Sequence, residues 1–193
     1  MSTISLKCDC GTVQGTAVNI TPKSGNRVAC CCSDCQAFAD YLDRRPQALD
    51  EHGGTEIYQT SQSQVKIHEG HDHLAAMRLS PKGLLRWYAS CCNTPIGNTM
   101  SSGLPFMGII HTFTDIEDRD KTLGPVRAYC QTQHAIGTVT HPKAHKKFPL
   151  GITGRILRQL ITWKIQGKNT PSAFYDKDGK PVSKPDILNG EPG

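Results

Sequence analysis

The sequence predicts a mainly β protein of the α+β class, in which small antiparallel sheets precede one C-terminal amphipathic helix. Short apolar and β-branched runs follow one another through the first 115 residues. The 18 Gly and 12 Pro residues fall largely between such runs, where they favour turns. Regularly spaced crossover helices, which a parallel sheet requires, are missing. Antiparallel pairing is therefore expected.

The expected elements can be placed in chain order. Residues 81–83 (Pro-Lys-Gly) mark a tight turn, so the runs on either side should form a hairpin. A short helix is expected over residues 34–42, with Ser33 as its N-cap. The expected strands cover residues 12–18, 27–32, 64–68, 74–79, 84–89 and 104–113.

The strongest helical pattern comes late in the chain, at about residues 152–166. Gly167 ends the pattern, and Arg155, Arg158 and Lys164 fall on other faces of the helix. The apolar residues that recur at helical spacing, and are expected to pack, are Ile152, Ile156, Leu157, Leu160, Ile161 and Ile165.

The net charge of +5 has one source. Residues 141–168 hold seven Lys and Arg residues and no Asp or Glu, whereas the rest of the chain is nearly balanced. Such a stretch either forms a solvated helix face or attracts an anionic partner. Only two aromatic residues, Phe148 and Trp163, lie among these charges, which disfavours nucleic acid as that partner.

Eight of the nine cysteines lie in three clusters, and Cys130 stands alone. No N-terminal apolar run resembles a signal peptide, and no apolar segment approaches the ~20 residues that span a bilayer. A cytoplasmic, reducing location and no membrane partner are therefore expected. In that setting clustered cysteines are typical of metal ligands or redox groups.

The first and third clusters together predict a structural zinc site. Cys8 and Cys10 form a C-x-C pair before Gly11, and residues i and i+2 of an extended segment point to the same side. Cys91 and Cys92 end the predicted hairpin and can complete a four-thiolate site. Adjacent residues of a strand point to opposite sides, so Cys91 can join only if the chain turns there.

The second cluster predicts a site with an open position. Cys30, Cys32 and Cys35 can wrap one metal ion and leave its fourth position free, as catalytic zinc sites do. Cys31 points the other way in an extended chain and is excluded as a ligand. Buried free thiols, or redox-active pairs at Cys30–Cys31 and Cys91–Cys92, are the alternatives. Cys130 is expected in the core.

The histidines offer competing ligands. His68, His71 and His73 form an H-x-x-H-x-H run beside Gly70, which favours an exposed loop over a metal site. His111 lies in an apolar run. It can be a core histidine with satisfied ring nitrogens, a general base, or the fourth ligand of the second cluster.

These motifs together resemble the glutathione-dependent formaldehyde-activating family, which includes centromere-protein-V-like proteins. The similarity rests on C-x-C-G, then C-x-C-S-x-C about twenty residues on, then a cysteine shortly before Thr-Pro, over roughly residues 5–115. The resemblance implies a β-tent fold around zinc. It also implies a structural zinc held by Cys8, Cys10 and Cys92. A second zinc, held by Cys30, Cys32 and Cys35, would engage the thiol of glutathione.

The chain departs from the family pattern at three places. Cys31 stands where the family has His, Gln36 stands where it has Arg, and Ala89 replaces the first cysteine of its later pair. Cys91 is then the substitute ligand. The resemblance divides the chain into a zinc-binding domain over residues 1–115 and a C-terminal extension over residues 116–193, packed on the same domain.

Two functions of different class follow. The first is a zinc-dependent carbon–sulfur lyase-like enzyme that acts on the adduct of a small, glutathione-like thiol with an aldehyde or related electrophile. Cys30, Cys32 and Cys35 would be its catalytic centre. The second is a zinc-stabilised binding module without catalysis, which presents residues 141–168 to a protein or nucleic acid.

Overall fold

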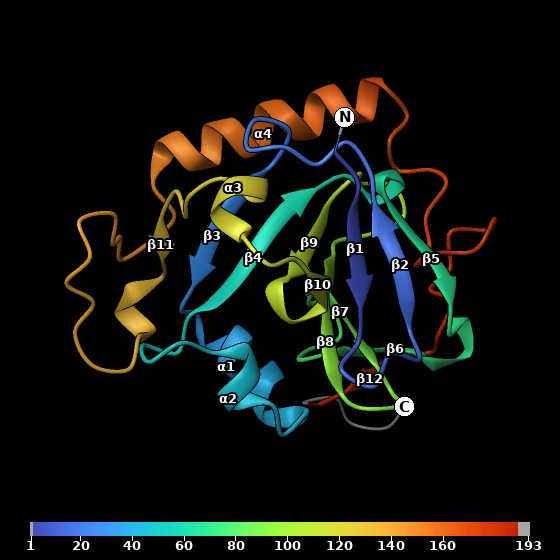
Figure 1. The fold of residues 1–193 in the computed structure, drawn as a ribbon, viewed down its shortest axis with the longest axis horizontal. Coiled ribbons are helices and arrows are strands. Elements are labelled where there is room, and N and C mark those ends of the chain that lie inside the picture. Colours follow the sequence, from blue (N-terminus) through green and yellow to red (C-terminus); the bar gives the residue numbers. More distant parts are fainter. Residues whose placement is uncertain (1, 189–193) are drawn as a thin grey trace.

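The computed structural model describes residues 2–188 as two β-sheets with helices around them (Figure 1). Within these residues the larger sheet has eight strands, in the order β11-β3-β4-β9-β8-β7-β6-β12, and the smaller sheet has the order β10-β1-β2-β5. This arrangement confirms the α+β, mainly β class. Residues 189–193 of the expected extension lie outside the described residues. The strands are β1 Ile4–Lys7, β2 Gln14–Ala17, β3 Asn26–Cys30, β4 Thr55–Thr60, β5 Val65–Glu69, β6 Leu74–Arg78, β7 Leu85–Ala89, β8 Thr94–Thr99, β9 Met107–Ile110, β10 Thr114–Asp115, β11 Tyr129–Cys130 and β12 Asp186–Ile187.

Most strand pairs are antiparallel, as expected, and β6 and β7 form the predicted hairpin. The two edge pairs of the larger sheet differ from the expectation, because β11 joins β3 and β12 joins β6 in parallel. Both added strands come from the C-terminal third of the chain. They reach the sheet edges through long connections, so they are free to run parallel to their neighbours.

The main core fills the space between the two sheets. Trp87 of β7 is fully buried there, and its ring centroid lies 5.1 Å from that of Phe174. The Trp87 indole N–H donates to the Thr99 hydroxyl at 2.8 Å, and that hydroxyl lies 2.9 Å from the Tyr175 hydroxyl. Phe174 and Tyr175 thus bring the late chain into the core formed by residues 4–113. Each large apolar side chain buried there contributes roughly 1.5–3 kcal/mol.

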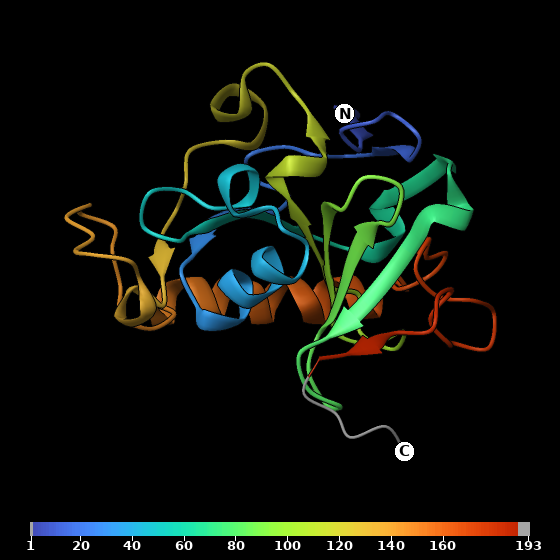
Figure 2. The ribbon, with the colours of Figure 1, turned by 90° about the horizontal axis from the view of Figure 1, so that it is seen from below.

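The opposite face of the larger sheet packs against helices. Figure 2 shows the smaller sheet and α4 (Leu150–Ile165) on opposite sides of the larger sheet. Phe38 and Leu42, at the end of α1, lie in a second apolar cluster with Val28 and Ile57 of this face. The remaining α-helices are α1 Ser33–Tyr41, α2 Arg45–Ala48 and α3 Arg119–Leu123. Helix α1 begins one residue earlier than expected, with Cys32 and not Ser33 at the N-cap.

Helix α4 lies near its expected place, but its expected packing face is wrong in part. Leu157, Ile161 and Ile165 are 58%, 53% and 82% exposed, although they recur at helical spacing. The inward face holds Trp163 and two polar residues, Arg155 and Gln159, which reach the loop before β3. These polar anchors rotate the helix, so half of its apolar residues face solvent.

Candidate metal centres

Four thiols from two distant loops meet at one end of the structure. The Sγ atoms of Cys8, Cys10, Cys91 and Cys92 all lie within 4.8 Å of one another. The Sγ atoms of Cys10 and Cys91 are 3.4 Å apart, those of Cys8 and Cys10 are 3.6 Å apart, and those of Cys91 and Cys92 are 3.8 Å apart. Cys91 belongs to the group because residues 90–93 form a turn. Both adjacent thiols can therefore face the same point.

Backbone bonds shape the first of these loops around a sulfur atom. The Gly11 N–H donates to the Cys8 carbonyl at 2.9 Å, and the Cys8 N–H donates to the Val13 carbonyl at 3.0 Å. The φ angle of Gly11 is +77°, which favours glycine. The Val13 N–H then points at the Cys8 Sγ at 3.2 Å, a donor that favours a thiolate.

The surroundings lower the pKa of two of these four thiols and raise the pKa of the other two. The Thr12 hydroxyl, 3.2 Å from the Cys10 Sγ, lowers the pKa of that exposed thiol to about 6. Burial raises the pKa of Cys92, but the Thr94 hydroxyl and the backbone N–H groups of Cys10 and Thr94 together outweigh it, and this pKa is lowered. Burial raises the pKa of Cys8, and it raises that of Cys91 to about 12. A bound cation is needed to hold all four as thiolates at neutral pH.

Arg44, just after α1, joins the two loops of this centre. Its guanidinium lies 3.1 Å from the Asp9 carboxylate and donates to the Cys92 carbonyl. Arg44, Ser90 and Asn93 also line a surface hollow of about 420 Å³ that reaches Cys91 and Cys92. Sequence patterns did not identify Arg44, because its partners are 35 and 48 positions away.

The second cluster places three thiols where β3 leads into α1. The Sγ atoms of Cys30, Cys32 and Cys35 lie within 4.8 Å of one another. Cys30 and Cys35 are buried, and Cys32 is half-buried. Among residues 2–188 no histidine, carboxylate or further cysteine supplies a fourth ligand atom to this group. Its ligand set is thus one short of a tetrahedron.

A buried arginine lies beside these thiols. Arg86 of β7 is 3% exposed, and its guanidinium carbon lies 5.6 Å from the ring centroid of Phe38 in α1. It forms an ion pair with the Asp34 carboxylate at 3.5 Å, and its guanidinium lies 3.4 Å from the Asn98 side-chain oxygen. Its positive charge also lowers the pKa of Cys32 and of Cys35.

The three thiols differ in acidity. Hydrogen bonds from the thiols of Cys30 and Cys35, with a smaller contribution from Arg86, outweigh burial and lower the pKa of Cys32 to about 2. The same contacts raise the pKa of Cys30. At Cys35 the contact with Cys30 lowers the pKa, but the contact with Cys32 and burial outweigh it and raise the pKa to about 12. Cys32 is therefore the thiol of this cluster that loses its proton most readily.

The remaining candidates lie outside both groups. Cys31 and Cys130 are fully buried and belong to neither group of thiols. His68 and His71 are exposed, and His73 is half-buried. The ring nitrogens of His111 lie 3.3 and 3.1 Å from the Glu56 and Gln47 carbonyls, and burial lowers the pKa of this histidine. That geometry is typical of a core histidine.

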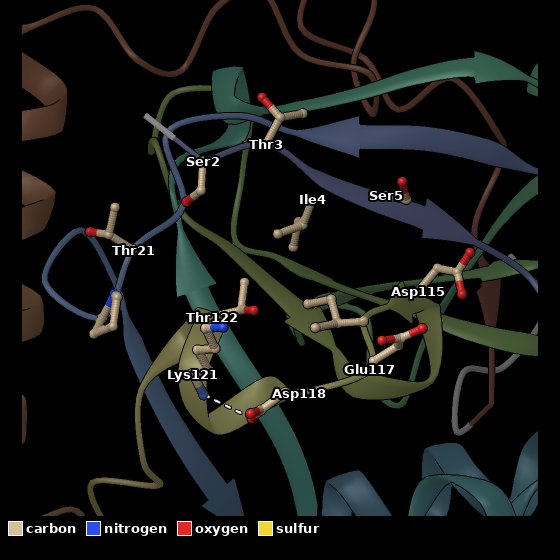
Figure 3. A pocket seen from close by; sticks show the side chains of 12 residues that line it. Ser2, Thr3, Ile4, Ser5, Thr21, Asp115, Glu117, Asp118, Lys121 and Thr122 are labelled. Atoms are coloured by element: carbon tan, nitrogen blue, oxygen red, sulfur yellow. Dashed lines mark hydrogen bonds between the residues drawn. The ribbon is translucent and has the colours of Figure 1, made fainter.

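A hollow of about 600 Å³ beside the N-terminal strand carries no comparable chemistry (Figure 3). Three acidic residues line it, but Asp115 pairs with Lys7 at 3.2 Å. Asp118 caps α3 by accepting the Lys121 N–H at 2.9 Å. Two of the three carboxylates are thus engaged in the fold, and we find the stronger candidate sites in the two thiol clusters.

The fold and its two thiol clusters define a class of cysteine-rich α+β protein. A family model described as a family of unknown function, DUF6151, matches residues 1–186, and the chain belongs to this family. A crystal structure of a Rhodobacter sphaeroides protein is similar at 16% identity and a TM-score of 0.44. That match covers 64% of this chain and 97% of the other. No curated protein matches the chain. Among residues 2–188, no helix is both long and apolar enough to cross a membrane.

Proposed function

We propose that this protein binds two zinc ions and acts as a carbon–sulfur lyase-like enzyme on adducts of a small thiol. Cys8, Cys10, Cys91 and Cys92 would hold a structural ion. Cys30, Cys32 and Cys35 would hold the ion of the reactive centre. The substrate class is the adduct of a glutathione-like thiol with an aldehyde or related electrophile.

The spacing of the first four sulfur atoms supports zinc there. A tetrahedron with zinc–sulfur bonds of about 2.3 Å has sulfur–sulfur edges of about 3.8 Å. The edges between neighbouring Sγ atoms run from 3.4 Å for Cys10–Cys91 to 3.9 Å for Cys8–Cys91. Four cysteines without carboxylate ligands also suit a soft metal better than magnesium or calcium. This ligand set is complete, so a structural role fits it.

The incomplete ligand set of the second cluster carries the functional proposal. Three thiols converge, no fourth ligand atom among residues 2–188 joins them, and Cys32 is accessible from outside. A bound zinc ion would lower the pKa of an incoming thiol, so that the thiol reacts as a thiolate near neutral pH.

The chain would assist the reaction through charge and position. Addition breaks the S–H bond of the substrate thiol and forms a bond from its sulfur to the carbonyl carbon. The carbonyl oxygen takes up a proton, and the reverse steps release the aldehyde. Arg86 supplies a positive charge beside the thiols, which favours an anionic sulfur and an oxygen that gains charge. Its place in β7 fixes that charge on a rigid element.

The resemblance to the glutathione-dependent formaldehyde-activating family supports the same assignment. It implies two zinc sites on matching cysteines, with the second one engaging glutathione. It also implies that the two sheets form a β-tent around the ions, which we include in the proposal. Zinc, glutathione and the cytoplasmic location remain parts of this proposal.

The test compares metal content and thiol chemistry in neighbouring cysteine variants. Protein purified without a metal-affinity tag should contain two zinc ions per chain, and Cys35→Ala should contain one. Cys31→Ala is the matched control, because Cys31 is buried beside the cluster but lies outside it, and it should keep two ions. Exchange NMR should show faster formation of the glutathione–formaldehyde adduct with the native protein and Cys31→Ala only. Equal rates with Cys35→Ala would refute the mechanism.

The surface of α4 favours a second candidate, a binding module without catalysis. Leu157, Ile161 and Ile165 are exposed beside Arg158 and Lys164 on this helix. An exposed apolar stripe with basic neighbours suits an acidic protein partner, and the basic charge also allows nucleic acid. This reading predicts two ions per chain, no thiol chemistry, and binding that weakens steeply with added salt.

A further inference from the structure

Helix α4 turns an apolar stripe to solvent along one edge of the molecule (Figure 1). Leu150, Leu157, Ile161 and Ile165 form this stripe, and their exposed fractions run from 53% to 89%. At about 100° per residue, these four side chains lie within an arc of about 80° around the helix axis. Gly154 lies in the same arc, and a Cβ atom there would meet no other part of the chain within 4 Å. The described part of the chain therefore leaves the stripe uncovered.

Basic residues border the stripe on both sides. Arg158 lies about 20° beyond Ile165 around the helix axis, and Lys164 lies about 20° beyond Leu157 on the other side. Both basic side chains are exposed, and the Lys164 ammonium donates to the Gly103 carbonyl at 2.6 Å. An apolar centre between basic borders is typical of helices that lie in the plane of a membrane surface, where Lys and Arg extend to the head groups.

The segment around the helix carries positive charge that its own carboxylates do not offset. Residues 141–168 hold seven Lys and Arg residues and no Asp or Glu. Among residues 2–188, no carboxylate forms an ion pair with any of the seven. Lys146 and Lys147, just ahead of α4, are exposed as well. An anionic surface is thus the partner whose charge complements this segment.

The same charges disfavour a second copy of the chain as the partner. Two stacked stripes would bring the Arg158 and Lys164 side chains of both copies to one interface, and residues 141–168 offer no carboxylate to pair with them. Like charges that meet at an interface weaken binding. Self-association through α4 is therefore opposed by its own border.

The composition of the stripe favours a lipid surface over a protein partner. Protein interfaces take most of their binding energy from a few residues seated in pockets, among which Trp, Tyr and Arg are enriched and Leu is under-represented. The stripe is purely aliphatic, and the tryptophan of this helix, Trp163, is buried on the opposite side. Leu and Ile side chains that enter a bilayer need no matching pocket.

We propose that α4 binds the protein to the surface of an anionic lipid bilayer. The apolar stripe enters the boundary between head groups and acyl chains, and Arg158 and Lys164 contact anionic head groups. A helix of 16 residues is about 24 Å long, so this face can lie flat on a bilayer. The expectation of no membrane partner rested on the lack of a spanning segment, which a surface helix does not need. The inference stands independently of zinc and of thiol chemistry.

Vesicle flotation with the intact protein tests the partner. The protein should bind vesicles of phosphatidylcholine with about 30% phosphatidylserine at least about tenfold more tightly than vesicles of phosphatidylcholine alone. Added salt should reduce this difference, because the charges that act lie at the surface. No binding to the anionic vesicles would overturn the proposal and return the stripe to an acidic protein partner. Equal binding to both kinds of vesicle would overturn the role of charge.

A matched pair of isoleucines tests the location. Ile161, in the centre of the stripe, is 53% exposed, and Ile136, in the loop between β11 and α4, is 49% exposed. Asp at either position changes the net charge equally and faces water, so both variants should fold, which thermal unfolding checks. Ile161→Asp should weaken vesicle binding at least about tenfold, and Ile136→Asp should leave it within about twofold. Ile165→Asp, at 82% exposure, is a second variant on the stripe. Equal binding of stripe and control variants would overturn the location.

Two variants that each remove one charge test the basic border. Arg158→Gln should weaken binding to anionic vesicles roughly fivefold, because one basic residue near such a surface contributes about that factor. Lys66→Gln is the matched control, since Lys66 is exposed in β5 of the smaller sheet, across the larger sheet from α4 (Figure 2). This control should leave binding within about twofold. Equal losses in both variants would reflect net charge alone and would overturn the placement of α4 on the bilayer.

Discussion

The two thiol clusters differ in how the chain builds them. The first joins residues more than 80 positions apart and gathers four thiols at the surface, where Cys10 is exposed. The second takes three thiols from six consecutive residues and buries two of them between the sheet and α1. A complete set of four thiol ligands from distant segments suits a structural metal site that holds those segments together. An incomplete set on a rigid frame suits one that leaves room for another molecule.

Their electrostatic surroundings differ in the same sense. Neutral groups contact the sulfur atoms of the first cluster, namely the Val13 N–H and the hydroxyls of Thr12 and Thr94, and the nearby cation Arg44 donates to the Cys92 carbonyl. A buried cation, Arg86, lies beside the second. With the proposed zinc bound, four thiolates would carry a charge of −2 partly in water, which would stabilise them. Three thiolates around the proposed second ion would carry −1, and Arg86 would compensate this charge where water is scarce.

The largest effect is expected from Cys8→Ala. Cys8 is buried and connects the loop after β1 to the turn after β7, and a structural metal contributes its binding energy to folding. We expect a loss of at least about 4 kcal/mol, or a Tm lower by roughly 10 °C or more for a chain of this size. Thermal unfolding measures it. Cys130→Ala, at a buried thiol outside both clusters, should cost about 1–2 kcal/mol. Equal losses would contradict a structural first centre.

Metal removal should be stepwise. The three-thiol centre has one protein ligand fewer than the four-thiol centre, so its affinity for zinc should be lower by at least about a hundredfold. During titration with a chelator, zinc release and circular dichroism are followed together. The ion of the three-thiol centre should leave early, with little change in the spectrum. The ion of the four-thiol centre should leave later, together with a drop in Tm. Simultaneous loss of both ions would remove the distinction between the centres.

Arg86→Met should shift the pH dependence of metal uptake at the second centre. Arg86 lowers the pKa of Cys32 and of Cys35, and thiols must lose their protons to bind metal. Without this charge the thiol pKa values rise, so the midpoint of uptake moves to higher pH, by roughly half a unit to one unit. The absorbance of a cobalt-substituted centre measures this midpoint. Arg86→Lys should stay close to the native midpoint, and a downward shift with Met would contradict the assignment.

The smallest effect is expected from Arg44→Met. Arg44 pairs with Asp9 and donates to the Cys92 carbonyl, so its loss loosens both loops of the first centre. We expect a loss of about 1–2 kcal/mol. Arg45→Met is the matched control, since Arg45 makes an exposed pair with Asp40 at 2.7 Å and such pairs contribute at most about 1 kcal/mol. Chemical denaturation of both variants decides whether Arg44 stabilises the centre.

Much of the fold could be predicted from local patterns. The β6–β7 hairpin has apolar runs on both sides of a Pro-Lys-Gly turn, and the structure confirms it. Strand β8 was not predicted, because its sequence Thr94–Thr99 contains Pro, Gly and Asn. Its six residues are buried by neighbours on both sides, and tertiary packing overrides their weak strand propensity.

The sites were predictable where ligands are close in sequence. The spacing of Cys30, Cys32 and Cys35 is enough to bring three thiols together, and the structure does bring them together. Arg86 was not identified, because its partner Asp34 is 52 positions away and nothing in the pattern of the predicted strand distinguishes this arginine from its neighbours. The outward face of α4 was also missed. Helical spacing identifies apolar residues that align, but Arg155 and Gln159 decide which side of the helix meets the sheet.

The two-residue strands at the rims of the larger sheet have a consequence for solubility. An uncovered strand edge presents free N–H and C=O groups, to which a strand of another chain can add. The strands β11 and β12 pair with the last two residues of β3 and β6, and each is too short to offer a long edge of its own. Cleavage ahead of Asp186 should free the backbone groups of Met77 and Arg78 in β6, where a strand of another chain can then add. The last third of the chain therefore protects the sheet from its own copies.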